Sequence, residues 1–591
     1  MAWSHAFSLA GSLLILSTAL LIVQTFWTGP GVPTLVAEHA VSAAERRIEI
    51  LLHPQDHVLR PADSLRHVWN ITSGRKVPDG VAKDVFLING QFPGPTIEAR
   101  SGDVLEVEVW NSLADEEVSI HWHGLLMRGA NHMDGATGIT QCAIPPGASY
   151  TYRFRIEQEG TFWYEYHAHS DVQRSDGLYG GLVVHPPGAI QQDEEILLLA
   201  GDWYHRPAGE VLDAFMDAKS DGSEPCPDSL LINGLGHFDC SRALPAFPVD
   251  CSPSDMPWIQ MDTRKTYRVR VANVGALTGI SITIPNAQIQ VTHFDGQRIT
   301  ASPPVNSVGV LYPGERVDFI LSWNRPEETS QLIIDLDKEN FQTPNLALSP
   351  TQSFAISDPK GQFSSSNQTE ITSFNLQTAQ GLLLPHPLPE PKSFVVLYSA
   401  IQILVHEHNI PMGFINRTHW KKQPQPLLSL GREDWNSYQL VPWTGPEPAW
   451  IDIVINNMDV TGHPFHLHGT TFYVLSSYRG KSGWDYFNPF DTSKPPKGGA
   501  YNVINPLEKD TVYVPPLGYV VLRFRADNEG IWMLHCHVLW HQASGMSMAV
   551  QVLGDEHAGF RDHRMGEVTR EYCSGTYSPS HLREVDKKLA I

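Results

Sequence analysis

The sequence predicts an all-β protein built of Greek-key sandwiches or barrels. Short segments alternate apolar and polar residues with the period of a strand, and no segment of any length shows helical periodicity. Turn formers, 46 Gly and 44 Pro, are scattered along a chain in which only 18% of the residues are charged. Short strands joined by frequent turns are typical of such folds.

The length and charge of the chain limit its organisation and its partners. A chain of 591 residues is far longer than one hydrophobic core usually supports, so we expect several domains. The formal charge of −22 would repel phosphate backbones and anionic lipid, and no basic cluster offsets it. Nucleic acid is therefore not an expected partner, and the expected substrate is small and neutral or cationic.

The first residues form a targeting segment. Residues 7–27 are apolar over a length that no soluble domain would leave at its N-terminus. The same length is enough to span a bilayer and no Lys or Arg precedes it, so a cleaved signal and a retained membrane anchor both stay open. Either one sends the chain into the secretory route, where N-glycosylation is expected. The acceptor sequons begin at Asn70, Asn367 and Asn416.

Two parts of the chain look like copies of one unit. Residues 102–111 alternate apolar and acidic side chains and run on to a histidine cluster, and residues 449–456 do the same. A middle part, with strands such as 267–271, repeats the pattern without the histidines and is expected to be a spacer. We therefore expect a leader and pro-region at 1–62, β-domains at 63–188, 189–358 and 395–556, a linker at 359–394 and a polar tail at 557–591.

The strongest functional motif is the tripeptide His535-Cys536-His537. A thiolate, two imidazoles and a weak thioether are the ligands of a blue-copper electron-transfer site. Because neighbours along a strand point to opposite faces, His535 and His537 would project away from Cys536 toward a second metal site. The predicted ligands of the mononuclear site are His463, Cys536, His541 and Met546.

Eight histidines form four pairs, each with the His-X-His spacing that puts both rings on one face of a strand. Eight imidazoles suffice for three copper ions with two, three and three ligands, which predicts a trinuclear, oxygen-reducing cluster. Four pairs at corresponding points of two repeated units argue against a chance occurrence of the spacing. A structural zinc site is disfavoured because such sites usually have more than one thiolate ligand. The pairs are His121 and His123, His167 and His169, His466 and His468, and His535 and His537.

At these residues the chain resembles the multicopper oxidase family of laccases, ascorbate oxidases and ferroxidases, from about residue 80 to 575. The resemblance implies three cupredoxin-like domains, with the cluster between the first and the third, and four copper ions. It implies one type 1 copper bound by His463, Cys536 and His541 with Met546 axial, one type 2 copper bound by His121 and His466, and two type 3 coppers, one bound by His123, His167 and His537 and the other by His169, His468 and His535.

Further stretches look closest to ascorbate oxidases, among them MDGATGITQC, which ends at Cys142, and LINGLGHFDC, which ends at Cys240. In that subgroup a cysteine at the first position bonds one near the C-terminus, which implies a disulfide between Cys142 and Cys573. Cys240 with Cys251 is the expected second disulfide. Cys226 is then the one cysteine left over after pairing in an oxidising compartment.

Two carboxylates bear on the expected activity. Asp134 corresponds to a family carboxylate beside the cluster, which would carry the proton relay, unless it is only a turn residue before Gly135. A second family carboxylate, three residues after the copper cysteine, is replaced by Leu539. Asp295 matches the position where laccases place an acid that accepts a phenol proton, although Asp295-Gly296 also fits a plain hairpin turn.

A laccase-type phenol oxidase of the fungal kind is the expected function. Small aromatic substrates would give up their electrons at His541, dioxygen would accept them, and the radicals would couple into dimers or pigments. Ascorbate is disfavoured because residues 220–225 lack the substrate-stacking Trp, unless the loop is misaligned or Trp443 replaces it. A ferroxidase would need carboxylates at the mononuclear site and commonly a C-terminal anchor. Retention of every expected ligand disfavours a non-catalytic copper-binding or storage protein.

Overall fold

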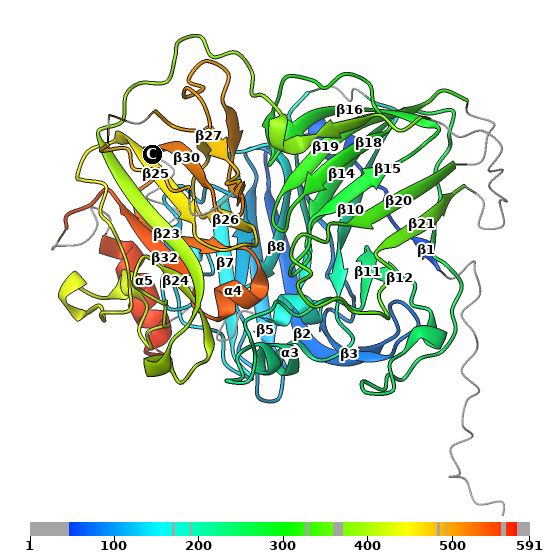
Figure 1. The fold of residues 1–591 in the computed structure, drawn as a ribbon, viewed down its shortest axis with the longest axis horizontal. Coiled ribbons are helices and arrows are strands. Elements are labelled where there is room, and N and C mark those ends of the chain that lie inside the picture. The colour runs from blue at the N-terminus through cyan, green and yellow to red at the C-terminus, as the bar shows by residue number, and fades with distance from the viewer. Residues whose placement is uncertain are drawn as a thin grey trace, which may run out of the picture. The chain divides into compact units, whose positions relative to one another are not determined.

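The computed structural model in Figure 1 describes residues 46–167, 172–188, 192–325, 330–357, 370–481, 485–491, 493, 495–556 and 563–575. The apolar segment at 7–27 and the sequon at Asn367 lie outside these residues. Among the described residues, none of the helices is both long enough and apolar enough to cross a membrane.

The described strands form six sheets, which lie along the chain as three successive pairs. The expectation of an all-β fold is confirmed. In the first pair the strand orders are β3-β2-β5-β7 and β4-β9-β8-β6. The alternation of residues 102–111 is that of β5, whose Leu105, Val107 and Val109 are buried. The bounds are β2 (Ser64–Lys76), β3 (Lys83–Ile88), β4 (Ile97–Arg100), β5 (Val104–Asn111), β6 (Ile120–His123), β7 (Ser149–Arg155), β8 (Gly160–Tyr166) and β9 (Tyr179–His185).

The middle pair of sheets encloses a core of its own. One sheet has the order β12-β11-β10-β14-β19-β16-β17, and the other the order β1-β13-β21-β20-β15-β18-β22. The bounds are β1 (Arg47–Ile48), β10 (Glu194–Trp203), β11 (Ser229–Ile232), β12 (Leu235–Gly236), β13 (Trp258–Ile259), β14 (Tyr267–Asn273), β15 (Ile280–Thr283), β16 (Ala287–Phe294), β17 (Gln297–Arg298), β18 (Ser307–Leu311), β19 (Arg316–Trp323), β20 (Ser330–Leu336), β21 (Thr351–Ile356) and β22 (Ser373–Asn375).

Residues 46–62, which fall within the expected leader and pro-region at 1–62, contribute to this middle core. The strand β1 pairs in parallel with β13, and Leu51 forms a bridge with Ile196. Ile48 and Ile50 are buried in the same core. Their apolar side chains are covered by the middle sheets because leaving them in water is unfavourable. The described fold therefore includes residues 46–62.

The third pair of sheets carries the second copy of the histidine-bearing unit. The strand orders are β24-β23-β25-β30-β27-β28 and β29-β26-β31-β32. The bounds are β23 (Ser393–Ile403), β24 (Pro411–Ile415), β25 (Ala449–Asn457), β26 (His463–Leu467), β27 (Phe472–Tyr478), β28 (Leu507–Lys509), β29 (Thr511–Val514), β30 (Tyr519–Ala526), β31 (Gly530–Cys536) and β32 (Ser547–Val552).

The three sheet pairs repeat one pattern of strand pairing. In the first, β5 lies between a parallel β2 and an antiparallel β7; in the third, β25 lies between a parallel β23 and an antiparallel β30. In the middle, β14 lies in the same way between β10 and β19. The internal repeat seen in the sequence is therefore a repeat of strand topology, shared by the middle part that carries no histidine pair.

The described helices are short, and all but α5 lie between strands. The structure has α2 (Gln55–Val58), α3 (Ala208–Phe215), α4 (Leu539–Ala543) and α5 (His563–Cys573), and the 3-10 turns η1 (Asn131–Met133), η2 (Gln173–Asp176), η3 (Cys240–Arg242), η4 (Leu376–Thr378), η5 (Val405–Glu407), η6 (Leu427–Ser429) and η7 (Arg432–Asp434). The strand β22 and the buried Leu376 belong to the expected linker, so part of that linker joins the middle core.

The expected polar tail contains the packed helix α5. This helix lies against η1 and η6, and the hydroxyl of Thr569 donates to the carbonyl of Thr140 at 2.9 Å. A disulfide joins its last residue, Cys573, to Cys142. The first sheet pair and the end of the chain are thereby fastened together.

One hydrophobic core connects the first and third sheet pairs. Trp122 of β6, Phe465 of β26 and Leu534 of β31 are all fully buried in it. Because side chains alternate along a strand, the histidines beside these residues face away from that core. The strands β6, β26 and β31 therefore present their histidines in the space where the first and third sheet pairs meet.

Candidate metal centres

The three strongest ligands predicted for the mononuclear site lie together. Sγ of Cys536, at the end of β31, lies 3.7 Å from Nδ1 of His463 and 3.6 Å from Nδ1 of His541 in α4. All three side chains are buried. Burial raises the pKa of the Cys536 thiol, but the two imidazoles more than offset this and lower it to about 7. The group places a readily ionised thiol between two imidazoles, and the resulting thiolate is a suitable copper ligand.

Met546 is held beside these ligands by its backbone. Its amide donates to the carbonyl of His541, and its carbonyl accepts a hydrogen bond from the amide of Cys536. The side chain is fully buried. Gly413 makes room for it, because a Cβ at that position would lie 2.6 Å from Cβ of Met546. The segment from Cys536 to Met546 is therefore a fixed unit.

Each imidazole of the mononuclear group has a carboxylate at its far nitrogen. Nε2 of His463 lies 2.9 Å from Oδ2 of Asp459, and Nε2 of His541 lies 3.2 Å from Oε1 of Glu224. Metal-bound histidines commonly donate their second ring nitrogen to such partners. Oε2 of Glu224 has no hydrogen-bond partner among the described residues, although Glu224 is buried.

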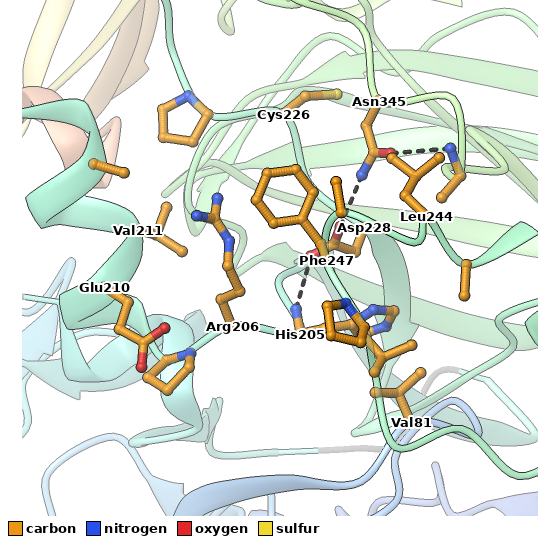
Figure 2. A pocket seen from close by; sticks show the side chains of 18 of the residues that line it. Val81, His205, Arg206, Glu210, Val211, Cys226, Asp228, Leu244, Phe247 and Asn345 are labelled. Atoms are coloured by element: carbon orange, nitrogen blue, oxygen red, sulfur yellow. Dashed lines mark hydrogen bonds between the residues drawn. The ribbon is translucent and has the colours of Figure 1, made fainter. Parts of the chain in front are cut away.

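A cavity of about 810 Å³ adjoins the mononuclear group on the side of Glu224. Apolar side chains from α3 and from the loop closed by the Cys240–Cys251 disulfide line much of it, including Val211, Leu244 and Phe247 (Figure 2). Phe247 covers the guanidinium of Arg206 at 5.3 Å. Glu224 lines the cavity and contacts His541, so it connects the open space to the mononuclear group.

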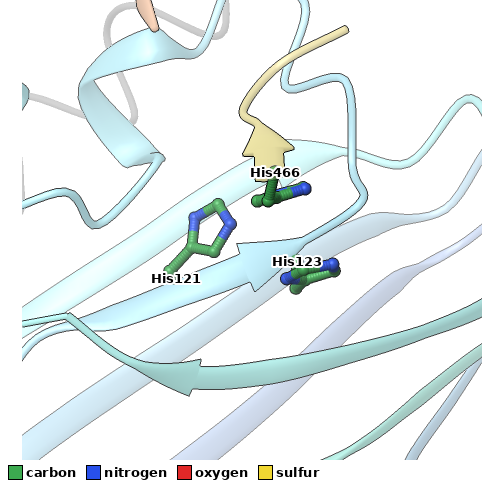
Figure 3. A group of neighbouring side chains, drawn as sticks. All are labelled: His121, His123 and His466. Carbon is green, nitrogen blue, oxygen red and sulfur yellow. The ribbon is translucent and has the colours of Figure 1, made fainter. Parts of the chain in front are cut away.

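The described histidines of the four pairs form one buried cluster. Figure 3 shows His121 and His123 on β6 with His466 of β26 beside them. The ring of His121 stacks on that of His468 at 3.7 Å, and the ring of His123 stacks on that of His466 at 3.8 Å. The remaining members that the structure describes are His167, His535 and His537.

Four histidines of this cluster each have one ring nitrogen that is suited to bind a metal ion. Nε2 of each of these histidines is buried and has no hydrogen-bond partner among the described residues. Nδ1 of each lies within 3.0 Å of a backbone carbonyl or carboxylate oxygen, which fixes the ring and leaves Nε2 free. Unpaired buried nitrogens are costly, so a bound metal ion is the expected partner. The four are His121, His466, His468 and His535.

His167 stands in a different ligand group from the one implied by the resemblance. Its ligand atom lies within 4.8 Å of those of His468 and His535, the group expected to contain His169. His169 lies outside the described residues. Residues two apart along a strand share a face, so a shift of two residues exchanges one side chain for the other. Among the described residues, His167 completes this group.

Glu165 takes the place that the resemblance assigns to His167. Its carboxylate lies with the ring nitrogens of His123 and His537, and these three ligand atoms are within 4.8 Å of one another. Sequence reasoning missed Glu165 because it examined only histidines. The available signal was its spacing, two residues before His167 on the same face of the strand.

Comparison with known proteins decides the family. Three family models, each described as multicopper oxidase, match residues 70–189, 194–354 and 408–556. The chain belongs to the multicopper oxidases. An iron transport multicopper oxidase of Epichloe festucae is 31% identical, over 83% of this chain and 76% of its own. A laccase of Cryptococcus neoformans is 30% identical over 92% and 89%, and an L-ascorbate oxidase of Cucumis sativus is 32% identical over 81% and 87%.

Solved structures of multicopper oxidases confirm the cupredoxin-like fold. One that functions in iron import superposes with a TM-score of 0.72 at 23% identity, over 89% of this chain and 95% of that one. A laccase from Botrytis aclada superposes with a TM-score of 0.71 at 26% identity over the same shares. Multicopper oxidases are copper-dependent oxidoreductases that use dioxygen and bind type 1, type 2 and type 3 copper.

Asp134 lies inside the histidine cluster of this multicopper oxidase. Its Oδ2 is 2.8 Å from Nδ1 of His468, and its backbone carbonyl is 2.8 Å from Nδ1 of His121. Burial raises the pKa of its carboxyl, but the two imidazoles outweigh burial and hold the pKa well below its usual range. Leu539, where the family has its second carboxylate, is buried in α4.

Asp295 does not reach the mononuclear group or the cavity beside it, which corrects its expected role. It is 1% exposed and forms the turn between β16 and β17, with φ of 49° and with φ of 77° at Gly296. Its carboxylate accepts from the amides of Arg316 and Thr511. Burial, the largest cause, raises its pKa to about 7. Asp295 therefore lies in a buried hairpin turn and is not among the residues that line the cavity.

The expected cysteine pairs are bonded in this oxidase. Cys142 is joined to Cys573 and Cys240 to Cys251, while Cys226 is free and lines the cavity. Two of the three sequon asparagines, Asn70 and Asn416, are described, and both are exposed. Trp443 donates its indole N–H to the carbonyl of Leu553 and does not line the cavity.

Proposed function

We propose that this multicopper oxidase is a laccase-type enzyme that oxidises small phenolic substrates by one electron at a time. The observation that carries the proposal is the carboxylate of Glu224, which lines the cavity and lies 3.2 Å from Nε2 of His541. A phenol that loses an electron must also lose its hydroxyl proton. An acceptor for that proton at the edge of the electron-accepting site is what the reaction needs.

The cavity suits an aromatic substrate. Its apolar lining by Val211, Phe215 and Phe247 favours a ring, and its volume of about 810 Å³ is in the range of small-molecule sites. The unpaired Oε2 of Glu224 supplies a polar acceptor for one hydroxyl group. His541, buried behind Glu224, is then the nearest imidazole of the mononuclear group to a bound phenol.

The proposed ligand sets follow the observed groups. Copper would supply the one-electron acceptor at the mononuclear group and the four-electron reduction of dioxygen at the histidine cluster. Cys536 lies between His535 and His537, so one tripeptide links the two centres covalently. His463, Cys536 and His541, with Met546, would hold the type 1 copper, His121 and His466 the type 2 copper, and His123 with His537 and His167 with His468 and His535 the type 3 pair.

Oxygen uptake with a panel of donors tests the function. The purified enzyme should consume dioxygen with electron-rich phenols faster than with ascorbate or Fe(II). Glu224→Gln should lower kcat/KM for phenols by about 100-fold, because proton acceptance is lost, and should leave oxidation of a donor that releases no proton unchanged. Asp213→Asn, on the exposed side of α3, is the matched control. Equal activity of Glu224→Gln and wild type toward phenols would contradict the proposal.

A ferroxidase is the second candidate. Asp459 and Glu224 flank the two imidazoles of the mononuclear group, and carboxylates are the ligands that Fe(II) would require there. Asp459 already accepts a hydrogen bond from the amide of Ile401, however, and the apolar cavity favours an organic donor. The same panel separates the two functions, because a ferroxidase would show a much lower KM for Fe(II) than for any phenol.

We also propose that the chain enters the secretory route. The apolar stretch at 7–27 and the two disulfides support this, because disulfides persist in oxidising compartments. The roles of Asn70 and Asn416 as glycan acceptors belong to the same proposal. Mass spectrometry of the mature protein from its source, before and after glycosidase treatment, tests both the cleavage and the glycans.

A further inference from the structure

Glu165 reaches the histidine cluster through the pairing of β8. The ladder between β6 and β8 sets Glu165 opposite His121. The side chain of Glu165 shares a strand face with Trp163, whose ring lies 5.1 Å from the ring of His123. Glu165 is 1% exposed. A carboxylate without access to water needs a cation or donors around it.

The two carboxylate oxygens of Glu165 have different surroundings. Oε1 faces imidazole nitrogens and lies 3.2 Å from Nδ1 of His123 and 3.1 Å from Nε2 of His537. Oε2 accepts a hydrogen bond from the guanidinium of Arg174. A carboxylate that binds a metal through one oxygen and a donor through the other has this arrangement, because the outer donor orients the ligand.

Arg174 compensates the charge of Glu165. It is buried, and its Nη2 donates to the backbone carbonyl of His537 at 3.1 Å, so it is fastened to the same strand end as the ligand histidine. The guanidinium of Arg174 forms a buried ion pair with the carboxylate through Oε2, which balances its negative charge. Glu165 is therefore available as an anionic ligand.

We propose that Glu165 supplies a carboxylate oxygen ligand to the copper held by His123 and His537, in place of a third imidazole. The proposal rests on the assignment of the histidine cluster to copper. A hard oxygen ligand favours Cu(II) over Cu(I) relative to a third imidazole, so this copper has a lower reduction potential than one with three imidazoles. Mixed ligation also makes the two members of the type 3 pair chemically unequal.

Copper content measured on the purified full-length holoenzyme tests the ligand. Glu165→Ala should lose about one equivalent of copper relative to wild type, and Glu165→His should retain it, because imidazole is a good copper ligand. His169→Ala is the matched variant and should keep the full content. Elemental analysis gives the content, and electron paramagnetic resonance reports whether the coupled pair survives.

Two further measurements keep the test decisive. Glu165→Gln preserves the shape and the contact with Arg174, so it should fold and yet lose copper faster than wild type during dialysis against a chelator. The blue absorption of the Cys536 site should persist in every variant and shows that each is folded. Full copper content in Glu165→Ala, or its loss in His169→Ala, would overturn the proposal. If the copper contents are as expected but the wild-type enzyme does not oxidise phenols, the result counts against the proposed substrate alone.

Discussion

Both terminal nitrogens of Arg316 lie 2.6 Å from a carboxylate oxygen of Asp510, and both side chains are buried. Arg316 begins β19 of the middle sheets, whereas Asp510 precedes β29 of the third pair. The backbone carbonyl of Asp510 lies 3.0 Å from Nδ1 of His466. The described middle sheets contribute no residue to the ligand groups, yet through this pair they fix a residue that orients one ligand.

Replacing Arg316→Met leaves the charge of the buried Asp510 without its arginine partner. We expect a loss of about 3–5 kcal/mol in the free energy of unfolding, because a buried pair that loses one partner retains the desolvation cost of the other. Chemical denaturation measures it. Arg525→Met removes an exposed arginine that pairs with Asp527, and it should change stability little. Equal effects of the two variants would contradict the expectation.

Cys536→Ser should abolish the blue colour and the turnover. The hydroxyl cannot replace the thiolate as an electron-transfer ligand, whereas the histidines of the cluster are unchanged. Visible absorption and copper analysis should show loss of about one copper equivalent, with the coupled pair retained. A variant that keeps its colour would show that Cys536 is not the ligand.

Met546→Leu should raise the reduction potential of the mononuclear site. A thioether donates weakly to Cu(II), and leucine removes that donor while it keeps much of the buried volume. Redox titration measures the shift, for which a tenfold change in a one-electron equilibrium corresponds to about 59 mV. The variant should then oxidise poorer donors than wild type does. An unchanged or lower potential would make Met546 a packing residue only.

Removing the bond between Cys142 and Cys573 should destabilise the chain more than removing that between Cys240 and Cys251. The first spans 431 residues and the second 11, so the chain-entropy model predicts a difference of about 3 kcal/mol. Thermal unfolding of the two double Cys→Ser variants compares them. A larger loss from the short loop would show that loop entropy does not govern the effect.

The stability of the middle sheets should depend on pH through His293. Burial, the largest cause, lowers the pKa of His293 from 6.5 to about 4; Arg268, Arg270 and Arg298 lower it further, and Asp318 opposes them. The unfolded chain binds more protons between those values, so His293 costs stability as the pH falls from 6.5 to 4. The loss is up to about 3 kcal/mol, an upper bound because the ring is partly exposed.

His293→Gln removes this titration. Its melting temperature should fall less than that of wild type between pH 6.5 and pH 4. His386→Gln, at an exposed histidine, should follow wild type. Parallel curves for wild type and His293→Gln would show that His293 does not contribute to acid sensitivity.

The sequence was sufficient for the parts of the structure that depend on local periodicity. Alternation predicted β5 and β25, and the tripeptide around Cys536 predicted two centres on opposite faces of one strand. The sequence was insufficient where two alternative strand registers place a residue on the same face. Residues two apart share a face in any strand, so alternation alone could not tell whether Glu165 or His167 joins His123 and His537; the ladder between β6 and β8 sets Glu165 opposite His121.

Contacts between distant parts of the chain were also beyond sequence reasoning. Glu224 reaches His541 across 317 positions, and its residue type alone does not distinguish it from the other carboxylates of the chain. Asp295 has the local signature of a turn and of a family acid, and only its partners Arg316 and Thr511 decide between them. Tertiary packing, and not residue type, sets these roles.

The short strand β1, from the far N-terminal side of the described chain, is the outermost strand of a middle sheet and covers β13. A recombinant protein begun at residue 63 would leave the edge of β13 and the neighbouring apolar surface unprotected. Unpaired strand edges recruit other strands, so such a shortened protein should self-associate and precipitate on concentration. One begun a few residues before Arg46 retains the covering strand and should stay monodisperse, which makes this short segment decisive for how the enzyme is produced.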